Sequence, residues 1–319
     1  MNTQAALKLD KEKFQGRDFI SLHDYTTAEI AYMLDVAADL KAKQKAGIPH
    51  PVLQGKSLAM IFTKSSTRTR VSFEVGIFQL GGQGLFLSSK DIQLGRGETI
   101  ADTARVLSRM VDGIMIRTFS HQEVLDLAEH ATVPVINGLT DLLHPTQGLA
   151  DLLTIKEHKG KLAGLKLVFI GDGNNVANCL MFGGAKMGMH VVIASPKGYV
   201  PDPEILAVAQ ADAQACGGTV TVINDPREAV AGADVLYTDV WTSMGQEDEA
   251  EARKQAFADY QVNTQLLSLA APDAIVMHCL PAHCGEEITA EVFEGPHSVV
   301  FDEAENRLHA HKAIMALVM

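Results

Sequence analysis

The chain has 319 residues, which is long for one hydrophobic core and predicts two domains of ordinary size. A formal net charge of -12 argues against non-specific nucleic-acid binding, and the composition of 47% hydrophobic and 6% aromatic residues is typical of a soluble α/β protein. No apolar run is long enough to span a membrane, and the N-terminus lacks the apolar core of a secretory signal. The cysteines are few and scattered, so we expect a cytoplasmic protein with neither a nucleic-acid nor a membrane partner.

The first half of the chain alternates short apolar runs with segments of helical periodicity. Strands are predicted here over 57–62, 83–87, 113–116 and 133–136. Helices are predicted over 27–43, 71–80, 99–110, 122–130 and 147–158.

The second half repeats the alternation and ends in a helix predicted over 303–319. Strands are predicted over 166–170, 190–194, 219–223, 235–238, 275–278 and 298–301. Residues 303–307 at the start of the last helix are mostly charged, and by default we expect them to be solvated.

Such alternation predicts parallel sheets covered by helices, because parallel strands need crossover connections. Two series of strands predict an α/β fold class with two doubly wound parallel-sheet domains that face a central cleft and are linked by helices. The predicted domains are 1–146, completed by the C-terminal helix 303–319, and 147–302.

Hydroxyl and cationic side chains gather at 64–70, directly after the first predicted strand and before a helix. Free N–H groups and the dipole at a helix N-terminus attract anions, and Arg68 and Arg70 add charge-assisted donors. A solvated basic helix start is the alternative. The hydroxyls and the position after a strand favour a phosphate-type ligand.

Other polar clusters also follow predicted strands, as Arg117 and Asn137 do. Ligands of open parallel sheets bind at the carboxyl ends of the strands, so these clusters predict a binding site there. The loop from Gly171 to Val176 resembles a dinucleotide-binding loop, but Val176 replaces its third glycine. The next strand also ends without an acidic residue, and both departures disfavour a nicotinamide cofactor.

Two His-Cys pairs, His278-Cys279 and His283-Cys284, have the ligand types that zinc prefers. Pro281 interrupts the segment, and no second pair elsewhere has a matching spacing. We therefore expect no metal.

Four segments together resemble the aspartate/ornithine carbamoyltransferase family, and its ornithine branch most closely. They are Ser-Thr-Arg-Thr-Arg at 66–70, His-Pro-Thr-Gln at 144–147, Asp-Val-Trp-Thr-Ser-Met-Gly at 239–245 and His-Cys-Leu-Pro at 278–281. The resemblance covers essentially the whole chain. It implies transfer of a carbamoyl group from carbamoyl phosphate to ornithine, with no cofactor, and a homotrimer with sites at the subunit interfaces.

The resemblance also implies a role for each matching residue. Those expected to take part in catalysis are Arg68, Arg117, His144 and Cys279. Those expected to bind carbamoyl phosphate are Ser66, Thr67, Arg68, Thr69, Gln93, Arg117, His144, Gln147, Cys279, Leu280 and Arg307, with Gln93 reaching a neighbouring subunit. Those expected to bind L-ornithine are Asn175, Asp239, Ser243 and Met244. Arg70 is the member of its motif that we expect to anchor the loop instead.

Several alternatives stay open at this point. Aspartate as the acceptor is disfavoured, because residues 239–249 contain acids and no cation. Putrescine or an acylated ornithine is a nearer alternative. A nicotinamide-dependent oxidoreductase and a non-enzymatic phosphoanion-binding protein are the distant ones.

Overall fold

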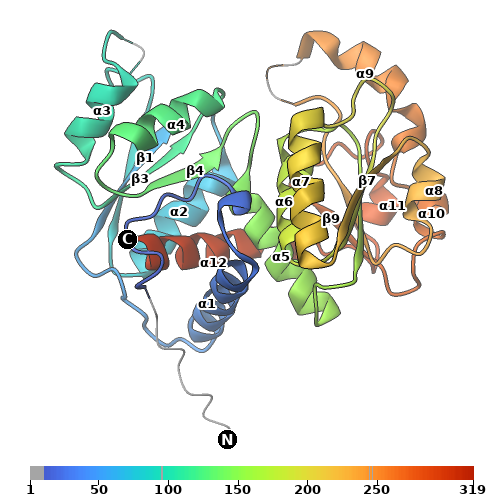
Figure 1. The fold of residues 1–319 in the computed structure, drawn as a ribbon, viewed down its shortest axis with the longest axis horizontal. Coiled ribbons are helices and arrows are strands. Elements are labelled where there is room, and N and C mark those ends of the chain that lie inside the picture. The colour runs from blue at the N-terminus through green and yellow to red at the C-terminus, as the bar shows by residue number, and fades with distance from the viewer. Residues whose placement is uncertain (1–10, 95, 244, 246) are drawn as a thin grey trace, which may run out of the picture. The chain divides into compact units, whose positions relative to one another are not determined.

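The computed structural model describes residues 11–94, 96–243, 245 and 247–319. They fall into two compact units, one within Met1–Leu153 together with Asn306–Met319, and one formed by Thr154–Glu305 (Figure 1). Both divisions fall inside helices, α5 (Pro145–Lys159) and α12 (Val300–Val318). No helix in the described part of the chain is long and apolar enough to cross a membrane.

Unit 1, the first of these, is built on a parallel sheet with the strand order β2-β1-β3-β4. Its strands are β1 (Ser57–Phe62), β2 (Gln83–Ser88), β3 (Gly113–Arg117) and β4 (Val135–Leu139). The chain proceeds from β1 to one side and returns through β3 to the other, so the direction of winding reverses between β1 and β3. Ligands of doubly wound sheets bind at such a switch point, beyond the carboxyl ends of the strands.

Helices cover both faces of this sheet. They are η1 (Leu22–Asp24), α1 (Thr27–Lys45), α2 (Thr67–Gln79), α3 (Ile100–Leu107) and α4 (His121–His130). The first part of α5 and the last part of α12 also belong to unit 1. Side chains of α3 and α4 form one core with Ile61 and Ile116. On the opposite face α2 approaches α12 so closely that a Cβ on Gly76 would lie 3.0 Å from Met315 Cε. Residues 313–318 of α12 are apolar and buried almost completely, as expected for a helix end that packs on all sides.

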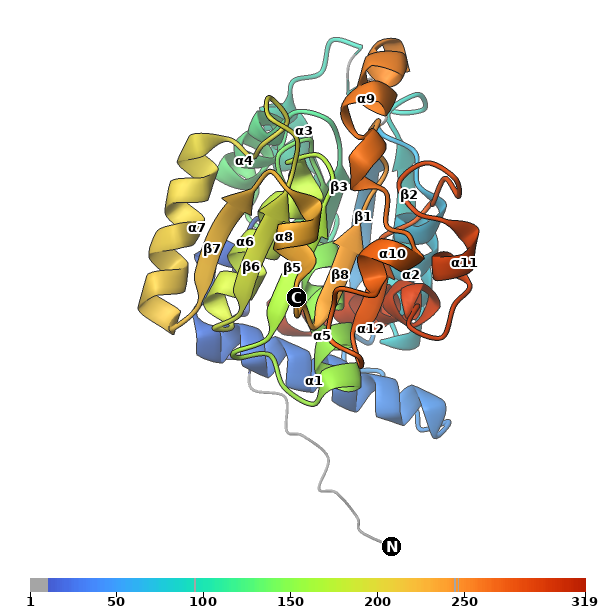
Figure 2. The same ribbon diagram turned by 90° about the vertical axis from the view of Figure 1, so that its right-hand side faces the viewer.

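Unit 2 is built on a parallel sheet with the order β7-β6-β5-β8-β9, of which Figure 2 shows β7, β6, β5 and β8 side by side. The strands are β5 (Lys166–Ile170), β6 (His190–Ala194), β7 (Thr219–Ile223), β8 (Val235–Thr238) and β9 (Ile275–His278). The winding reverses between β5 and β8, because the chain moves outward through β6 and β7 before it returns to the other side of β5. The carboxyl ends of β5 and β8 are therefore the expected ligand position.

The helices of unit 2 also divide between the two faces. They are α6 (Asn175–Lys186), α7 (Pro203–Cys216), α8 (Pro226–Val230), η2 (Glu247–Glu249), α9 (Ala250–Ala256), η3 (Ala258–Tyr260), α10 (Thr264–Leu267) and α11 (Ala290–Phe293). Side chains of α8, α10 and α11 share a core with Val192. The adjacent Val191 points to the other face, where a Cβ on Gly184 of α6 would lie 2.4 Å from it. Only glycine lets α6 pack this closely.

The predicted fold class of parallel-sheet α/β units is confirmed, and β1 and β5 to β9 have the predicted bounds. The strand predicted over 298–301 is wrong. Ser298 makes a single bridge to Val276, and α12 begins at Val300. A short apolar run does not distinguish a buried strand from the buried start of a helix.

Two helix predictions also need correction. The helix predicted over 71–80 begins earlier, at Thr67, so that most of the phosphate-type motif lies in its first turn. The charged start of the last helix is not a solvated surface throughout, because Glu303 and Arg307 are buried.

Candidate active site

The anion site predicted from the sequence falls at the N-terminus of α2 in unit 1. Ser66 is its N-cap, and the Ser66 side chain accepts a hydrogen bond of 3.2 Å from the backbone N–H of Thr69. The first turn contains no acidic residue, so the positive end of the helix dipole is not neutralised within it. Thr63 N–H, just after β1, donates to the Arg117 carbonyl at 3.0 Å and joins this turn to the end of β3.

Two buried guanidinium groups converge on Thr69. Arg117, the last residue of β3, donates to Thr69 Oγ1 at 3.4 Å, and Arg307 from α12 donates to the same oxygen at 2.9 Å. Thr69 is fully buried, and Arg117 and Arg307 are 5% and 3% exposed. The switch point between β1 and β3 therefore carries two desolvated cations, which is the charge that an anionic ligand requires.

The start of α5 completes this cluster. Gln147 Oε1 accepts a hydrogen bond of 2.6 Å from Arg307 Nη1, and Gln147 Nε2 donates to Asp151 Oδ1 at 2.7 Å. His144 is buried, and burial together with the nearby Arg307 and Arg117 holds its pKa well below the usual range. His144 is thus neutral at physiological pH and offers an imidazole that can donate or accept a hydrogen bond.

The other residues predicted for this site are less buried than Thr69, Arg117 and Arg307. Ser66 and Arg68 are half-buried and Thr67 is exposed, all at the start of α2. Gln93 is exposed on the loop between β2 and α3, where its carbonyl accepts a hydrogen bond from Arg96 N–H. Arg70 pairs with Glu74 at 3.0 Å and lies 3.6 Å from the ring centroid of Phe86, which are the contacts of an anchoring residue.

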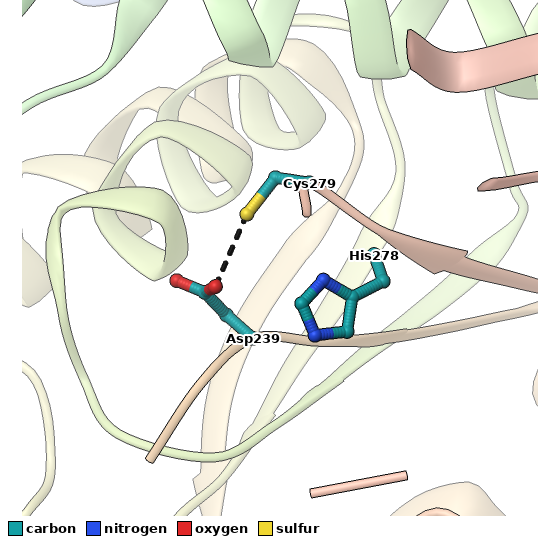
Figure 3. A group of neighbouring side chains, drawn as sticks. All are labelled: Asp239, His278 and Cys279. Carbon is teal, nitrogen blue, oxygen red and sulfur yellow. Dashed lines mark hydrogen bonds between the residues drawn. The ribbon is translucent and has the colours of Figure 1, made fainter. Parts of the chain in front are cut away.

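Unit 2 gathers a different set of groups at the ends of β8 and β9 (Figure 3). Asp239 follows β8 and is buried, and the Cys279 thiol after β9 donates to Asp239 Oδ1 at 3.1 Å. The Asn174 side chain donates to Asp239 Oδ2 at 2.9 Å while it also caps α6. Both carboxylate oxygens are oriented by neutral donors, so Asp239 keeps its negative charge available to a cation.

His278 lies beside this pair but its ring nitrogens are engaged elsewhere. Its Nδ1 accepts a hydrogen bond of 2.9 Å from Leu280 N–H, so Nε2 carries the proton and donates to the buried Glu287 carboxylate at 2.9 Å. The ligand atoms of Asp239, His278 and Cys279 lie within 4.8 Å of one another. Both nitrogens of the imidazole already make hydrogen bonds, so neither is available to a metal ion. The three side chains therefore stabilise the loops after β8 and β9 and do not form a metal site.

The remaining ornithine-side predictions follow the strands β5 and β8. Asn175 is the first residue of α6, and Ser243 lies on the loop after β8; both are half-buried. Met244 lies outside the described residues. Leu280, which follows Cys279, has φ of 61° in the left-handed region.

Arg253 is a site-supporting residue that we did not predict from the sequence. It is 6% exposed and donates to Asp172 at 2.8 Å, to Glu249 at 2.9 Å and to the Trp241 carbonyl at 3.1 Å. These bonds tie the loop after β8 to the turn after β5. Burial raises the pKa of Asp172, although the Arg253 guanidinium opposes the shift. A charged residue on a short helix gives no sequence signal of such a role.

Two family models match nearly the whole chain. The model of the aspartate/ornithine carbamoyltransferase carbamoyl-P binding domain matches residues 17–157, and that of the Asp/Orn binding domain matches residues 163–318. The chain belongs to the aspartate/ornithine carbamoyltransferase family. The predicted resemblance is thereby confirmed.

Individual members of the aspartate/ornithine carbamoyltransferase family are close in sequence and structure. The chain is 65% identical to an ornithine carbamoyltransferase of Symbiobacterium thermophilum over 305 residues, which are 96% of this chain and 98% of the relative. It is 58% identical to an anabolic ornithine carbamoyltransferase of Pyrococcus furiosus, over 95% of this chain and 96% of the relative. Among solved structures, ornithine carbamoyltransferase from Pyrococcus furiosus matches with a TM-score of 0.93 at 57% identity, covering 96% of this chain and 97% of that one.

Proposed function

We propose that this enzyme transfers the carbamoyl group of carbamoyl phosphate to the side-chain amine of L-ornithine, giving L-citrulline and phosphate in arginine biosynthesis. The observation that carries the proposal is the buried carboxylate of Asp239 at the switch point of unit 2, which suits an amine-bearing acceptor. The names of the relatives support the proposal, since they are ornithine carbamoyltransferases and one of them is called anabolic.

Carbamoyl phosphate binds unit 1 in this proposal. The phosphate lies at the first turn of α2, where the helix dipole and Arg68 attract it. We assign this role to Ser66, Thr67, Arg68 and Thr69, and contact with the carbamoyl end to Arg117, His144, Gln147 and Arg307. Residues 1–146 with 303–319 form the carbamoyl-phosphate-binding domain, and 147–302 the ornithine-binding domain.

Ornithine binds unit 2 through its α-amino and carboxylate groups. Asp239 pairs with the ammonium, and Asn175, Ser243 and Met244 bind the remaining polar groups. Cys279 and Leu280 lie where the side-chain amine and the carbamoyl group meet. The Cys279 thiol donates to Asp239, which fixes its position beside the carboxylate. Desolvation lowers the pKa of an amine and thus favours its reactive neutral form.

The reaction joins the neutral amine nitrogen to the carbamoyl carbon. The carbon–oxygen bond to phosphate breaks, the nitrogen loses a proton, and the departing phosphate takes up that proton. The carbonyl oxygen gains negative charge in between, and the N–H donors of Arg117 and the neutral His144 stabilise it. Because these donors are buried and held in place before the reaction, little reorganisation is required when the charge develops.

The proposed assembly is a homotrimer in the cytoplasm with active sites at the subunit interfaces. One face of α2 exposes Val71, Val75 and Phe78, which are 52%, 37% and 76% exposed in the single chain. Large exposed apolar side chains on one helical face are typical of a surface that another protein covers. Gln93, which is exposed on its loop, is then available to a neighbouring site.

An acceptor assay tests the assignment. The purified protein is incubated with carbamoyl phosphate and, in separate reactions, with ornithine, putrescine, Nα-acetylornithine or aspartate. We expect citrulline from ornithine and no more than background product from the others. Carbamoylputrescine or an acetylated citrulline, formed without citrulline, would instead select the nearer alternatives; no product from any amine would leave phosphoanion binding as the function.

A further inference from the structure

The imidazole of His311 lies behind the guanidinium of Arg307 within unit 1. The two residues are one helical turn apart on α12, and Arg307 Nε lies 3.4 Å from His311 Nε2. The His311 ring is fully buried and stacks on Phe73 of α2, with the ring centroids 3.9 Å apart and the planes inclined by 21°. This packing fixes the plane of the imidazole.

The direction of each hydrogen bond around His311 can be deduced. A guanidinium only donates, so His311 Nε2 is an acceptor and Nδ1 carries the proton. That proton is donated to Ser72 Oγ at 2.9 Å. Ser72 Oγ in turn donates to the Arg68 carbonyl oxygen at 2.6 Å. A single directed chain therefore runs from Arg307 through His311 and Ser72 to the backbone of Arg68.

This chain joins two parts of the same anion-binding site. At one end Arg307 directs its other nitrogens to Thr69 and Gln147. At the other end the Arg68 carbonyl belongs to the first turn of α2, whose N–H groups face the phosphate in the proposed function. The bond from Nε to His311 is a third anchor for the guanidinium, besides those to Thr69 and Gln147, and it opposes rotation about the flexible side chain.

We propose that His311 is a positioning residue for carbamoyl phosphate binding, which holds the guanidinium of Arg307 in register with the first turn of α2 through Ser72. The inference rests on the proposed function for the identity of the ligand. His311 itself does not touch the substrate. It acts only in its neutral form, which burial and the adjacent Arg307 favour by holding its pKa well below the usual range.

The test compares His311→Leu with His311→Gln. Leucine fills the buried space but removes both hydrogen bonds, whereas a glutamine amide keeps one acceptor for Arg307 and one donor for Ser72. We expect His311→Leu to raise the KM for carbamoyl phosphate, and the Kd for inorganic phosphate measured by calorimetry, by about tenfold. The KM for ornithine should be unchanged, and His311→Gln should restore most of the phosphate affinity.

Two further variants keep the test decisive. Ser72→Ala removes only the hydroxyl that accepts from His311, and it should weaken phosphate binding in the same direction even if His311→Leu fails to fold. Ile314→Val, equally buried on the same helix, is the control and should leave phosphate affinity unchanged. Unaltered phosphate affinity in folded His311→Leu and Ser72→Ala would overturn the inference. Absence of citrulline formation by the wild-type protein would overturn the proposed function, while phosphate affinity would still decide the role of His311.

Discussion

The two units place opposite charges at equivalent positions of similar sheets. In unit 1 the switch point between β1 and β3 carries Arg117, with Arg307 contributed by α12. In unit 2 the switch point between β5 and β8 carries Asp239, oriented by Asn174 and Cys279. The topology thus determines where a ligand binds, and the side chains at the strand ends determine its charge.

The two sites also differ in how they are supported. The cations of unit 1 are held by a buried network that extends along α12 to His311 and from there to Ser72 on α2. The carboxylate of unit 2 is held by direct hydrogen bonds from Asn174 and Cys279. Arg253 stabilises the loop after β8 without bonding to Asp239 itself. We therefore expect substitutions at the cations of unit 1 and their supports to affect carbamoyl phosphate, and substitutions at Asp239 and its supports to affect ornithine.

Arg68→Ala should have the largest effect. It removes a cation from the first turn of α2, and we expect kcat/KM to fall by about 10²–10³-fold, the loss typical of removing one preorganised donor from an active site. Steady-state kinetics with carbamoyl phosphate as the varied substrate measure it. Arg70→Ala is the matched control, since Arg70 pairs with Glu74 and Phe86, and it should retain most activity. Equal losses in both variants would contradict the separate roles of the two arginines.

Asp239→Asn tests the other half of the comparison. It preserves the shape of the side chain but removes the charge that we pair with the ornithine ammonium, so the KM for ornithine should rise by about 100-fold. The Kd for inorganic phosphate should not change. Asp248→Asn, an exposed acid further along the same loop, is the control and should behave like the wild type. A parallel loss of phosphate affinity in Asp239→Asn would show that the two sites are not independent.

Arg253→Met should have a smaller effect, and again on ornithine alone. Arg253 touches neither predicted ligand but ties the loop after β8 to Asp172, so we expect the KM for ornithine to rise by about tenfold at most. Thermal unfolding should show a lower melting temperature as well, because Asp172 is left without its cation. An unchanged KM for ornithine with a lower melting temperature would restrict Arg253 to a purely structural role.

Much of the fold follows from local sequence patterns. The strands β5, β6, β8 and β9 are buried on both faces along most of their length and read as short apolar runs, whereas β7 alternates threonine with valine; both patterns made the bounds predictable. The run at 298–301 reads the same way, yet its last residues begin α12. Nothing local distinguishes the two cases, because the difference lies in what covers the run after folding.

The candidate site is predictable only where its residues form motifs. The family resemblance predicted that Arg307 belongs to the site. It did not predict that Arg307 is buried, because the hydrogen-bond partners Thr69 and Gln147 are 238 and 160 positions away. His311 is different, since its spacing of one turn from Arg307 does predict a shared helical face. Its hydrogen bond to Ser72 nevertheless depends on the packing of α2 against α12, which no spacing reveals.

Lys312 gives the last and smallest prediction, because it changes stability and not ligand binding. It adjoins His311 on α12, is fully buried, and donates to Gln44, Gln79 and His50 at 3.0, 3.0 and 3.2 Å. Burial lowers its pKa from 10.5 to about 8. Between these two values the unfolded chain binds a proton that the folded chain has lost, so the free energy of unfolding should rise as the pH increases from 8 to 10.5.

Lys312→Met removes this titration. In urea unfolding at equal protein concentration, the stability of the wild type relative to Lys312→Met should increase over that pH range, by on the order of 2 kcal/mol. Phosphate affinity at pH 7 should be the same in both proteins, because the ammonium of Lys312 donates to the amides and the imidazole named above and not to Arg307. A difference in stability that does not vary with pH would show that Lys312 is not desolvated in the folded state. A loss of phosphate affinity would instead show that the network supporting the cations of unit 1 includes Lys312. The two sites would then differ even more, because Asp239 is supported only by its direct hydrogen-bond partners among the described residues.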